Sequence, residues 1–384
     1  MQTSSLIPYH RASSWRVGRG VVKLVVRFGI IGAGAMGGVY AHALATEVAS
    51  GVLVAIGGGS KAPQLAAEFG VKCEPSSEAL IARSDIDAVI IGTPPSSHLP
   101  LVRASAEAGH HVFVEKPMGR TVAECDEMIE ACHKAGVLLT INKLSRFRPP
   151  GAAAKRAIIR GDVGDVLMIR VQLVHAGLED NMPGASQGVS NWIRDPAEGT
   201  TYLDWGSHAC DMIRWLSSSE PTLAFGQFSD YRTDPIPPLS RSGMAQYTLA
   251  SGALAQVWCT EEMVPPGMPT ETEYLVMGSE GTLIVDLYGA LLLGKNGSWT
   301  EIARQPPIDY MNDPWHPDRV RGYAIQTEEF AQCISEGGRP SVSPEDGRAA
   351  IEMVQATEES ARRGEVVRLP LSNPPGPLSA NQRI

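Results

Sequence analysis

The sequence has few cysteines, no long hydrophobic run and fewer bases than acids, and each shortage excludes a class of protein. Its six cysteines are scattered without a CxxC pair, which argues against a disulfide-stabilised secreted domain or a structural zinc site and favours a cytoplasmic protein. No stretch approaches the roughly 20 uncharged apolar residues of a membrane-spanning helix, so no membrane partner is expected. With 33 Lys and Arg against 42 Asp and Glu, the net charge is −9, which argues against a nucleic-acid partner.

What the sequence does contain is enough apolar material for two folded domains. Its 384 residues are 43% hydrophobic and only 20% charged, which suits two ordinary cores better than one. Acidic residues are missing from the first 46 positions, where a targeting peptide is an alternative to a disordered or misassigned start. We therefore predict an N-terminal extension (1–23), a nucleotide-binding domain (24–145), a substrate-binding and oligomerisation domain (146–369) and a Pro-rich tail (370–384).

In the first domain, short apolar runs alternate with helical segments. This alternation predicts an α/β fold with a doubly wound parallel sheet of the Rossmann type. The expected strands cover residues 25–31, 52–56, 88–92, 112–114 and 137–141, and the expected helices 37–46, 64–69, 97–108 and 122–135.

After Pro149 and Pro150 the rhythm changes to strand after strand, which predicts an α+β domain with a large, open, mostly antiparallel sheet. If one sheet face stays uncovered, apolar positions such as Leu249, Val257 and Leu275 would favour a homodimer or homotetramer through that face. The expected strands are 166–175, 223–231, 244–249, 253–260, 272–277, 282–286, 291–293 and 365–369, with helices at 152–160, 203–216, 319–334 and 344–363.

A glycine pattern, Gly32-x-Gly34-x-x-Gly37, follows the first strand and opens the first helix. With 39 glycines in the chain the pattern alone is weak, but its position at this turn is typical of dinucleotide binding. The helix N-terminus at Ala35 and Met36 would then face the pyrophosphate. A glycine turn without a ligand is the alternative.

The end of the second strand bears on the choice of cofactor. NAD-dependent enzymes usually place a carboxylate there to bind the adenosine ribose, yet no acid occurs between Glu47 and Glu68. A hydroxyl, a cation and flexible backbone could instead hold a 2′-phosphate, so NADP is favoured, NAD is possible, and an ordinary polar loop is the alternative. The residues concerned are Gly58, Gly59, Ser60 and Lys61.

Two further motifs end neighbouring strands at the edge where doubly wound sheets bind ligands. One is Glu115-Lys116-Pro117, which on its own could be a surface ion pair, and the other is Thr93-Pro94-Pro95 with His98. In the second domain, Asp204 and His208 stand four apart on an expected helix, with Asp211 nearby. A metal site, a helix cap with an incidental histidine, and a histidine base oriented by a carboxylate are the three interpretations, and we favour the last.

Taken together and in this order, these motifs resemble the glucose-fructose oxidoreductase/inositol dehydrogenase/MocA (Gfo/Idh/MocA) family over residues 25–369. The resemblance implies that Lys116 binds the reacting oxygen, that His208 removes the hydroxyl proton and that Asp204 binds a neighbouring hydroxyl. It also implies cofactor contacts for Thr93, Pro94, Pro95, His98, Glu115, Lys116 and Asn142, and substrate contacts for Arg146, His175, Trp192, Arg194, Asp204 and His208.

The expected function is hydride transfer between a nicotinamide cofactor and a secondary alcohol or ketone of a sugar, inositol or related polyol, without a metal. The cations Lys143, Arg146 and Arg148 leave open a carboxylated cyclic diol or a semialdehyde as substrate, although solvated surface arginines are the favoured interpretation of these residues. An NAD-dependent glycosidase-like enzyme is a second alternative. A non-catalytic NADP-sensing regulator is a third, although it would not need Lys116, Asp204 and His208 in catalytic register. The loop at 177–190 sets this protein apart, so substrate identity does not follow from the resemblance.

Overall fold

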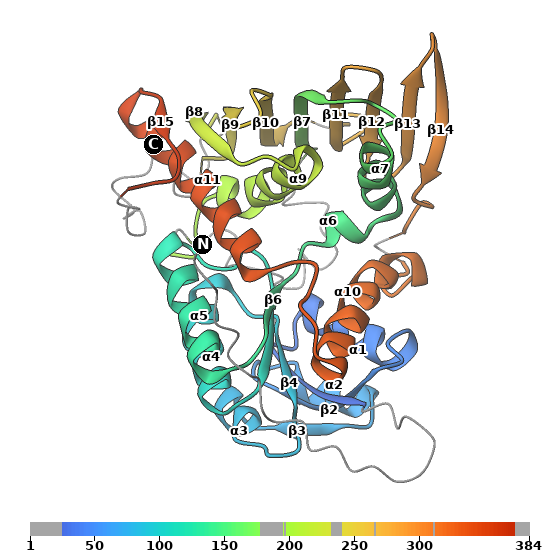
Figure 1. Cartoon of the computed structure of the whole chain (residues 1–384). Helices are drawn as coiled ribbons and strands as arrows, with labels where there is room; N and C mark the ends of the chain where they lie inside the picture. Colours follow the sequence, from blue (N-terminus) through green and yellow to red (C-terminus); the bar gives the residue numbers. More distant parts are fainter. Residues whose placement is uncertain are drawn as a thin grey trace, which may run out of the picture.

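The computed structural model describes residues 25–176, 195, 197–231, 240–264, 266–309 and 312–372. Two sheets, each with its own helices, lie one above the other (Figure 1). The expected extension at 1–23, most of the expected tail, and the expected substrate residues Trp192 and Arg194 lie outside the described residues. Within the described ranges, no helix is long and apolar enough to cross a membrane.

The lower sheet is the predicted parallel Rossmann sheet. All its neighbouring strands pair in parallel, and the strand order reverses between β1 and β4, which is where nucleotides bind in such sheets. In spatial order the strands are β3 (Lys72–Glu74), β2 (Gly51–Gly57), β1 (Val26–Ile31), β4 (Ala88–Ile91), β5 (His111–Val114) and β6 (Leu139–Ile141).

Helices cover both faces of this sheet, so its strands read as continuous apolar runs rather than alternating ones (Figure 1). The helices end where the sequence signals it: the Thr121 side chain caps α5 by accepting from the Glu124 N–H, and Gly136 closes it in the left-handed region. The short β3 and α3 were not predicted. The helices are α1 (Ala35–Thr46), α2 (Ala62–Glu68), α3 (Ser77–Ile81), α4 (His98–Glu107) and α5 (Val122–Ala135).

The upper sheet has nine strands, of which β7 and β10 pair in parallel and all other neighbours are antiparallel, so the mostly antiparallel prediction is confirmed. β14 was not predicted. In spatial order the strands are β14 (Ser298–Arg304), β13 (Ala290–Lys295), β12 (Thr282–Asp286), β11 (Thr272–Gly278), β7 (Val166–Ala176), β10 (Leu254–Met263), β9 (Ser242–Leu249), β8 (Pro221–Ser229) and β15 (Val367–Arg368).

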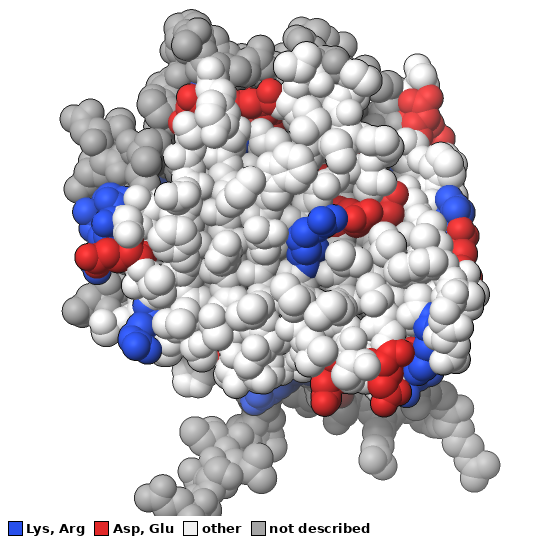
Figure 2. Space-filling model, turned by 90° about the horizontal axis from the view of Figure 1, so that it is seen from above, with Lys and Arg blue, Asp and Glu red and all other residues white. Residues whose placement is uncertain are grey.

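Helices α7 (Pro149–Ile159), α9 (Ser207–Ser217) and α11 (Pro344–Arg363) cover one face of the upper sheet, and the other face is open (Figures 1 and 2). The expectation for this open face was partly wrong. Leu249 and Val257 are buried in the core under the helices, and only Leu275 of the three belongs to the open face. Because side chains alternate along a strand, a phase error of one residue exchanges the two faces.

One helix departs from the predicted division of the chain at residue 145. Helix α10 (Pro317–Glu336) is far along the sequence but packs on α1, and its Tyr323 and Phe330 share a core with Tyr40 and Phe113 of the Rossmann part (Figure 1). Helix α10, although it falls in the range 146–369, therefore belongs to the core of the Rossmann part.

Candidate active site

Each glycine of the first turn is required for a different physical reason. Gly32 has φ +97°, and a Cβ there would lie 2.8 Å from the Gly92 carbonyl oxygen. A Cβ on Gly37 would lie 2.0 Å from the Gly32 oxygen, so the helix approaches the strand closely there. Gly34 has an ordinary φ of −78° and open space where its side chain would be. That open space, at the N-terminus of α1 where Ala35 begins the helix, fits a dinucleotide pyrophosphate.

The turn after β2 also fits a phosphate group. Gly58 and Gly59 have φ values of +76° and +87°, so neither position readily accepts a side chain. Ser60 and Lys61 are exposed at the start of α2, and among the described residues no ion-pair partner of Lys61 is found. A hydroxyl and a free ammonium therefore stand where a carboxylate would bind the ribose of NAD.

Glu115 is a buried carboxylate that holds the sheet edge together. It accepts hydrogen bonds from the Tyr40 hydroxyl at 2.7 Å, from Asn142 Nδ2 at 2.8 Å and from the Lys116 N–H at 2.9 Å. The Asn142 Oδ1 atom is buried and has no hydrogen-bond partner among the described residues. An orphaned acceptor at this edge fits the carboxamide N–H of a nicotinamide. Tyr40 was missed in the sequence because it stands 75 residues from Glu115.

His98 lies beside this edge but is fully buried. Its Nε2 contacts the Thr93 carbonyl oxygen at 2.9 Å, and its Nδ1 contacts the oxygens of Pro117 and Met118 at 3.0 and 3.1 Å. Burial lowers the pKa of His98 despite these contacts. The imidazole thus ties the Thr93 loop to the segment after Lys116, and we propose that it orders the cofactor loops without touching the cofactor.

Lys116 and Asp204 meet across the two parts of the molecule. The Lys116 Nζ lies 2.5 Å from Asp204 Oδ1. Burial opposes the charge on Lys116, but Asp204 outweighs it and raises the lysine pKa above its ordinary value. Asp204 lies on η3 (Tyr202–Gly206), one turn of π-helix ahead of α9, a local irregularity common at functional sites.

A pocket adjoins this pair. On the described surface its lining contains three carboxylates and no lysine or arginine. Both oxygens of Glu198 bind Ser96, which clamps the Thr93 loop to the second domain in a contact that the sequence did not reveal. The lining residues are Pro95, Pro117, Glu198, Gly199, Thr200, Thr201, Leu203, Asp204, Trp205 and Glu261.

His208 lies on α9 just beyond this irregular turn. No residue that the structure describes is hydrogen-bonded to its ring, so the carboxylate expected to orient this histidine is not found among them, and Asp204 binds Lys116 instead. Burial, and then the positive charges of Lys116, Lys143 and Arg148, hold the pKa of His208 well below its usual value. The imidazole is therefore neutral at neutral pH and able to accept a proton.

His175 stands at the end of β7, as expected. Its ring packs on Trp205 with 4.1 Å between ring centres, and its Nδ1 lies 3.2 Å from Glu271. The other ring nitrogen, Nε2, is buried and finds no partner in the part of the chain that the structure describes, which fits a substrate hydroxyl.

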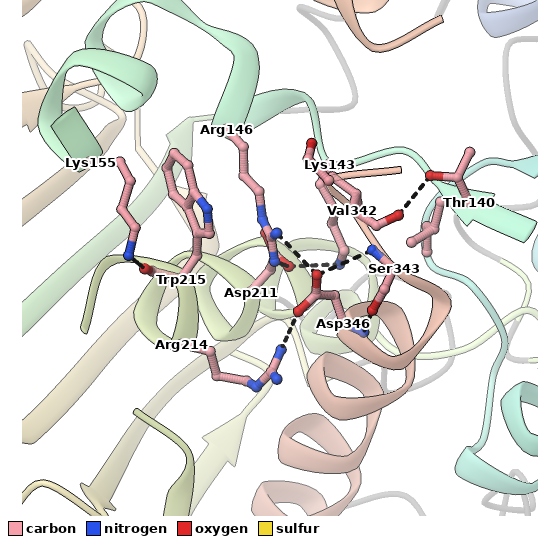
Figure 3. Close-up of polar contacts among 12 residues, drawn as sticks. Thr140, Lys143, Arg146, Lys155, Asp211, Arg214, Trp215, Val342, Ser343 and Asp346 are labelled. Atoms are coloured by element: carbon pink, nitrogen blue, oxygen red, sulfur yellow. Dashed lines mark hydrogen bonds and ion pairs between the residues drawn. The ribbon is translucent and has the colours of Figure 1, made fainter. Parts of the chain in front are cut away.

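The prediction that Arg146 binds substrate is wrong. Its side chain is 5% exposed, its Nε and Nη2 bind both oxygens of Asp211 at 2.9 and 2.6 Å, and its Nη1 binds Asp346 at 3.1 Å (Figure 3). Because Asp211 is engaged in this way, it does not converge with Asp204 and His208 on a metal. In the described part of the chain, no group of three His, Cys, Asp or Glu side chains could hold a metal ion.

A Rossmann sheet whose ligand edge brings Lys116 against Asp204 of η3, with His208 at the start of α9, is an arrangement that suits an oxidoreductase of CH–OH groups. Residues 26–143 match the family model described as "Oxidoreductase family, NAD-binding Rossmann fold", and residues 152–284 match the "GFO/IDH/MocA C-terminal domain". The chain belongs to the GFO/IDH/MocA family, as the sequence motifs predicted.

Characterised relatives act on sugars and inositols. The chain is 28% identical over 360 residues to the scyllo-inositol 2-dehydrogenase (NAD(+)) of Bacillus subtilis, covering 90% of this chain and 96% of the relative. It is 29% identical over 298 residues to the D-apiose dehydrogenase of Paraburkholderia graminis, covering 76% and 75%.

Solved structures share the fold. The aldose-aldose oxidoreductase of Caulobacter crescentus, complexed with glycerol, superposes with a TM-score of 0.76 at 25% identity, covering 90% of this chain and all of that one. Levoglucosan dehydrogenase, in complex with NADH and L-sorbose, superposes with a TM-score of 0.78 at 23% identity, covering 90% and 99%.

Proposed function

We propose that this oxidoreductase uses NADP to oxidise a secondary alcohol of a neutral sugar, inositol or related polyol, or to reduce the corresponding ketone. The observation that carries the proposal is the Lys116–Asp204 pair beside His208, whose ring lacks a hydrogen-bond partner among the described residues. When an alcohol is oxidised, its carbon loses a hydride and its oxygen loses a proton. A cationic lysine can stabilise the charge on that oxygen, and a neutral histidine can accept the proton.

In the oxidation, Lys116 donates a hydrogen bond to the reacting oxygen and stabilises the negative charge that develops there. The neutral imidazole of His208 accepts the hydroxyl proton, which leaves a ketone and an imidazolium. Asp204 holds the ammonium of Lys116 in place and accepts from a neighbouring hydroxyl. When bound, the oxidised nicotinamide supplies the acceptor for the hydride that leaves the same carbon.

The preference for NADP rests on the turn after β2. Ser60 and Lys61 offer a donor and a cation for a 2′-phosphate, and the sequence has no acid between Glu47 and Glu68. Gly34 and the orphaned Oδ1 of Asn142 fit the rest of either dinucleotide.

The charges of the site favour a neutral substrate over the carboxylated diol. Arg146, one of the cations that left the acidic substrate open, is engaged by two aspartates, and Arg148 stacks on Tyr288 with 4.2 Å from guanidinium carbon to ring centre. The pocket beside Asp204 contributes Glu198 and Glu261, which would repel a carboxylate.

The proposed assembly is a homodimer or homotetramer through the open face of the upper sheet. Figure 2 shows this face as largely uncharged. Arg170 and Glu273 form an ion pair between the neighbouring strands β7 and β11. Exposed apolar residues there include Met168, Met244, Met277 and Leu254.

The test is a panel of sugars, inositols and cyclic polyols with NADP and NAD, read by the absorbance of the reduced cofactor. Lys116→Met and His208→Ala should each lower kcat/KM on the best substrate by about 100-fold or more, while Lys134→Met, at an exposed helix position, should not. Wild-type turnover in both site variants would refute the proposal. Turnover of a glycoside without net cofactor reduction would indicate the glycosidase-like enzyme, and dinucleotide binding without any turnover would indicate a regulator.

A further inference from the structure

Glu198 is a carboxylate of the second domain whose two oxygens both bind the Rossmann part. Its Oε2 accepts from the Ser96 N–H at 2.8 Å, and its Oε1 accepts from the Ser96 hydroxyl at 2.6 Å. Hydrogen bonds to a carboxylate are roughly twice as strong as those between neutral groups, and a pair of them fixes orientation as well as distance. The two residues are 102 positions apart, and Glu198 belongs to none of the sequence motifs.

Ser96 lies in a loop that touches the glycine turn of the expected dinucleotide site. The loop follows β4, where the strand order of the Rossmann sheet reverses. A Cβ on Gly32 would lie 2.9 Å from Thr93 Cγ2, so the two turns are in contact. The Ser97 hydroxyl contacts Thr93 Oγ1 at 2.6 Å and the Pro94 oxygen at 2.7 Å, which ties the loop to itself. A group bound against Thr93 therefore also fixes the position of Ser96.

On the other side of the contact, Glu198 begins the short segment that leads to Asp204. The Thr200 hydroxyl oxygen accepts from the Leu203 N–H at 2.9 Å, and the Thr200 carbonyl oxygen accepts from the Asp204 N–H at 3.2 Å. The Thr200 hydroxyl also donates to Glu358 of α11 at 2.5 Å. These bonds shape the start of η3, so the position of Glu198 bears directly on where Asp204 lies.

The Ser96–Glu198 contact and the Lys116–Asp204 contact both join the two parts of the molecule beside one pocket. The pocket lining contains both carboxylates, Glu198 and Asp204, together with Pro95, which precedes Ser96 in the loop. The width of the pocket therefore depends on both contacts. Loss of either one would let its two walls move apart.

We propose that Glu198 is a positioning residue that acts through Asp204. By holding the segment before Asp204 to the Thr93 loop, it makes a bound dinucleotide and a bound polyol stabilise each other. The role rests on the proposed function, in which the loop contacts the dinucleotide and Asp204 accepts from a substrate hydroxyl. Because such coupling is reciprocal, it can be measured from the cofactor side without a substrate.

The first experiment measures hydrogen–deuterium exchange of the full chain, alone and with saturating NADPH. In the wild type, NADPH should slow exchange at residues 32–37 of the glycine turn and also at residues 199–206 of the second domain. In Glu198→Ala the slowing at 199–206 should fall at least about two-fold, while the slowing at 32–37 remains. Ser96→Ala should show the same loss to a smaller degree, and it replaces Glu198→Ala if that variant does not fold.

Glu329→Ala is the matched control for this experiment, because Glu329 of α10 binds the N–H and hydroxyl of exposed Ser341 in the same way. An effect of NADPH on 199–206 that is absent from the wild type, or unchanged in Glu198→Ala, overturns the inference. A merely structural role would give the second result, with faster exchange but the same ratio with and without NADPH. If neither NADPH nor NADH slowed exchange at 32–37, the dinucleotide site and the inference would both be refuted.

The second experiment uses the best substrate of the panel in a double-mutant cycle. Glu198→Ala should lower kcat/KM by about 10-fold and Ser96→Ala by less, because small displacements of a positioned group are costly. The double variant should be no worse than Glu198→Ala, since both changes break one contact. Glu198→Gln, which keeps an acceptor oxygen for Ser96, should recover part of the loss.

Losses that multiply in the double variant would overturn the inference, because the two residues would then act separately. Failure of the proposed function would show differently. No compound of the panel would be turned over, or His208→Ala would keep its turnover, while the exchange difference between wild type and Glu198→Ala persisted.

Discussion

At the scale of single residues, Lys61 is the side chain on which the proposed preference for NADP over NAD depends most. It stands at the start of α2, beyond two glycines with positive φ, in a stretch of the sequence that has no acid between Glu47 and Glu68. A charge-assisted hydrogen bond contributes about 1.5–3 kcal/mol, and every 1.4 kcal/mol is a factor of ten in affinity.

From this we expect Lys61→Ala to lower kcat/KM with NADP by about 10- to 100-fold and to leave kcat/KM with NAD unchanged. Steady-state kinetics with both cofactors measure the ratio. Lys72→Ala on β3 is the control, because Lys72 is also an exposed lysine of this edge. An equal loss with both cofactors would contradict a contact to the 2′-phosphate.

At the scale of elements, the ion-pair network joins α6 (Leu144–Phe147), α9 and α11 behind the site. Arg146 connects Asp211 of α9 with Asp346 of α11, and Ser343 and Asp346 form a reciprocal cap at the start of α11 (Figure 3). The same network holds α9, which carries His208, in place. A substitution that weakens the network should therefore lower the stability of the fold and also disturb the position of His208.

Removal of Arg146 should be strongly destabilising, because Asp211 is fully buried and would lose both of its direct donors. We expect Arg146→Met to lower the free energy of unfolding by about 3–5 kcal/mol, measured by urea denaturation. Arg103→Met, which breaks the half-exposed pair with Glu127, should cost about 1 kcal/mol or less. An equal loss of unfolding free energy in the two variants would contradict the expectation that a buried ion pair costs more to break than an exposed one.

The pH dependence of stability follows from Asp346. Burial alone would raise its pKa, but the ion pairs with Arg146 and Arg214 outweigh burial and hold its pKa below the usual value. A lowered pKa in the folded state means that this stabilisation is complete above the unfolded pKa of about 3.9 and is lost as the pH falls through the folded one. The network should therefore weaken only in strong acid.

At the scale of the whole molecule, the open face of the upper sheet is the surface on which we expect a second subunit to bind. Residues 168 and 277 are cross-strand neighbours on β7 and β11, and Met244 faces Trp258 across β9 and β10. An apolar sheet of nine strands with one uncovered face buries it most simply against a second copy.

We expect the wild type to sediment as a dimer or tetramer at micromolar concentration and the double variant Met244→Glu/Met277→Glu to sediment as a monomer, because the two charges would have to be buried. Ile159→Glu is the control, since Ile159 is an exposed apolar residue at the end of α7, away from this face. A monomeric wild type, or a variant that stays associated, would contradict the proposed interface.

The order of strands and helices, the glycine turn and the motifs at the strand ends were readable from the sequence, because each depends on local rules. Backbone at Gly32 needs a positive φ, buried parallel strands are apolar throughout, and caps such as Thr121 and Gly136 stand next to the helices they end. These features predicted the family and the Rossmann sheet, and they supplied the candidate residues for the chemistry.

Only the tertiary structure decided which distant side chains meet. Arg146 and Asp346 are 200 residues apart, and nothing near Arg146 in the sequence shows that its guanidinium is neutralised and so withdrawn from substrate. The face of the sheet on which Leu249 and Val257 lie depends on the phase of their strands. The contact of Asp204 with Lys116 likewise depends on how the π-helical turn packs against the Rossmann sheet. Charge and burial act through space, so they become visible only when the chain has brought its partners together.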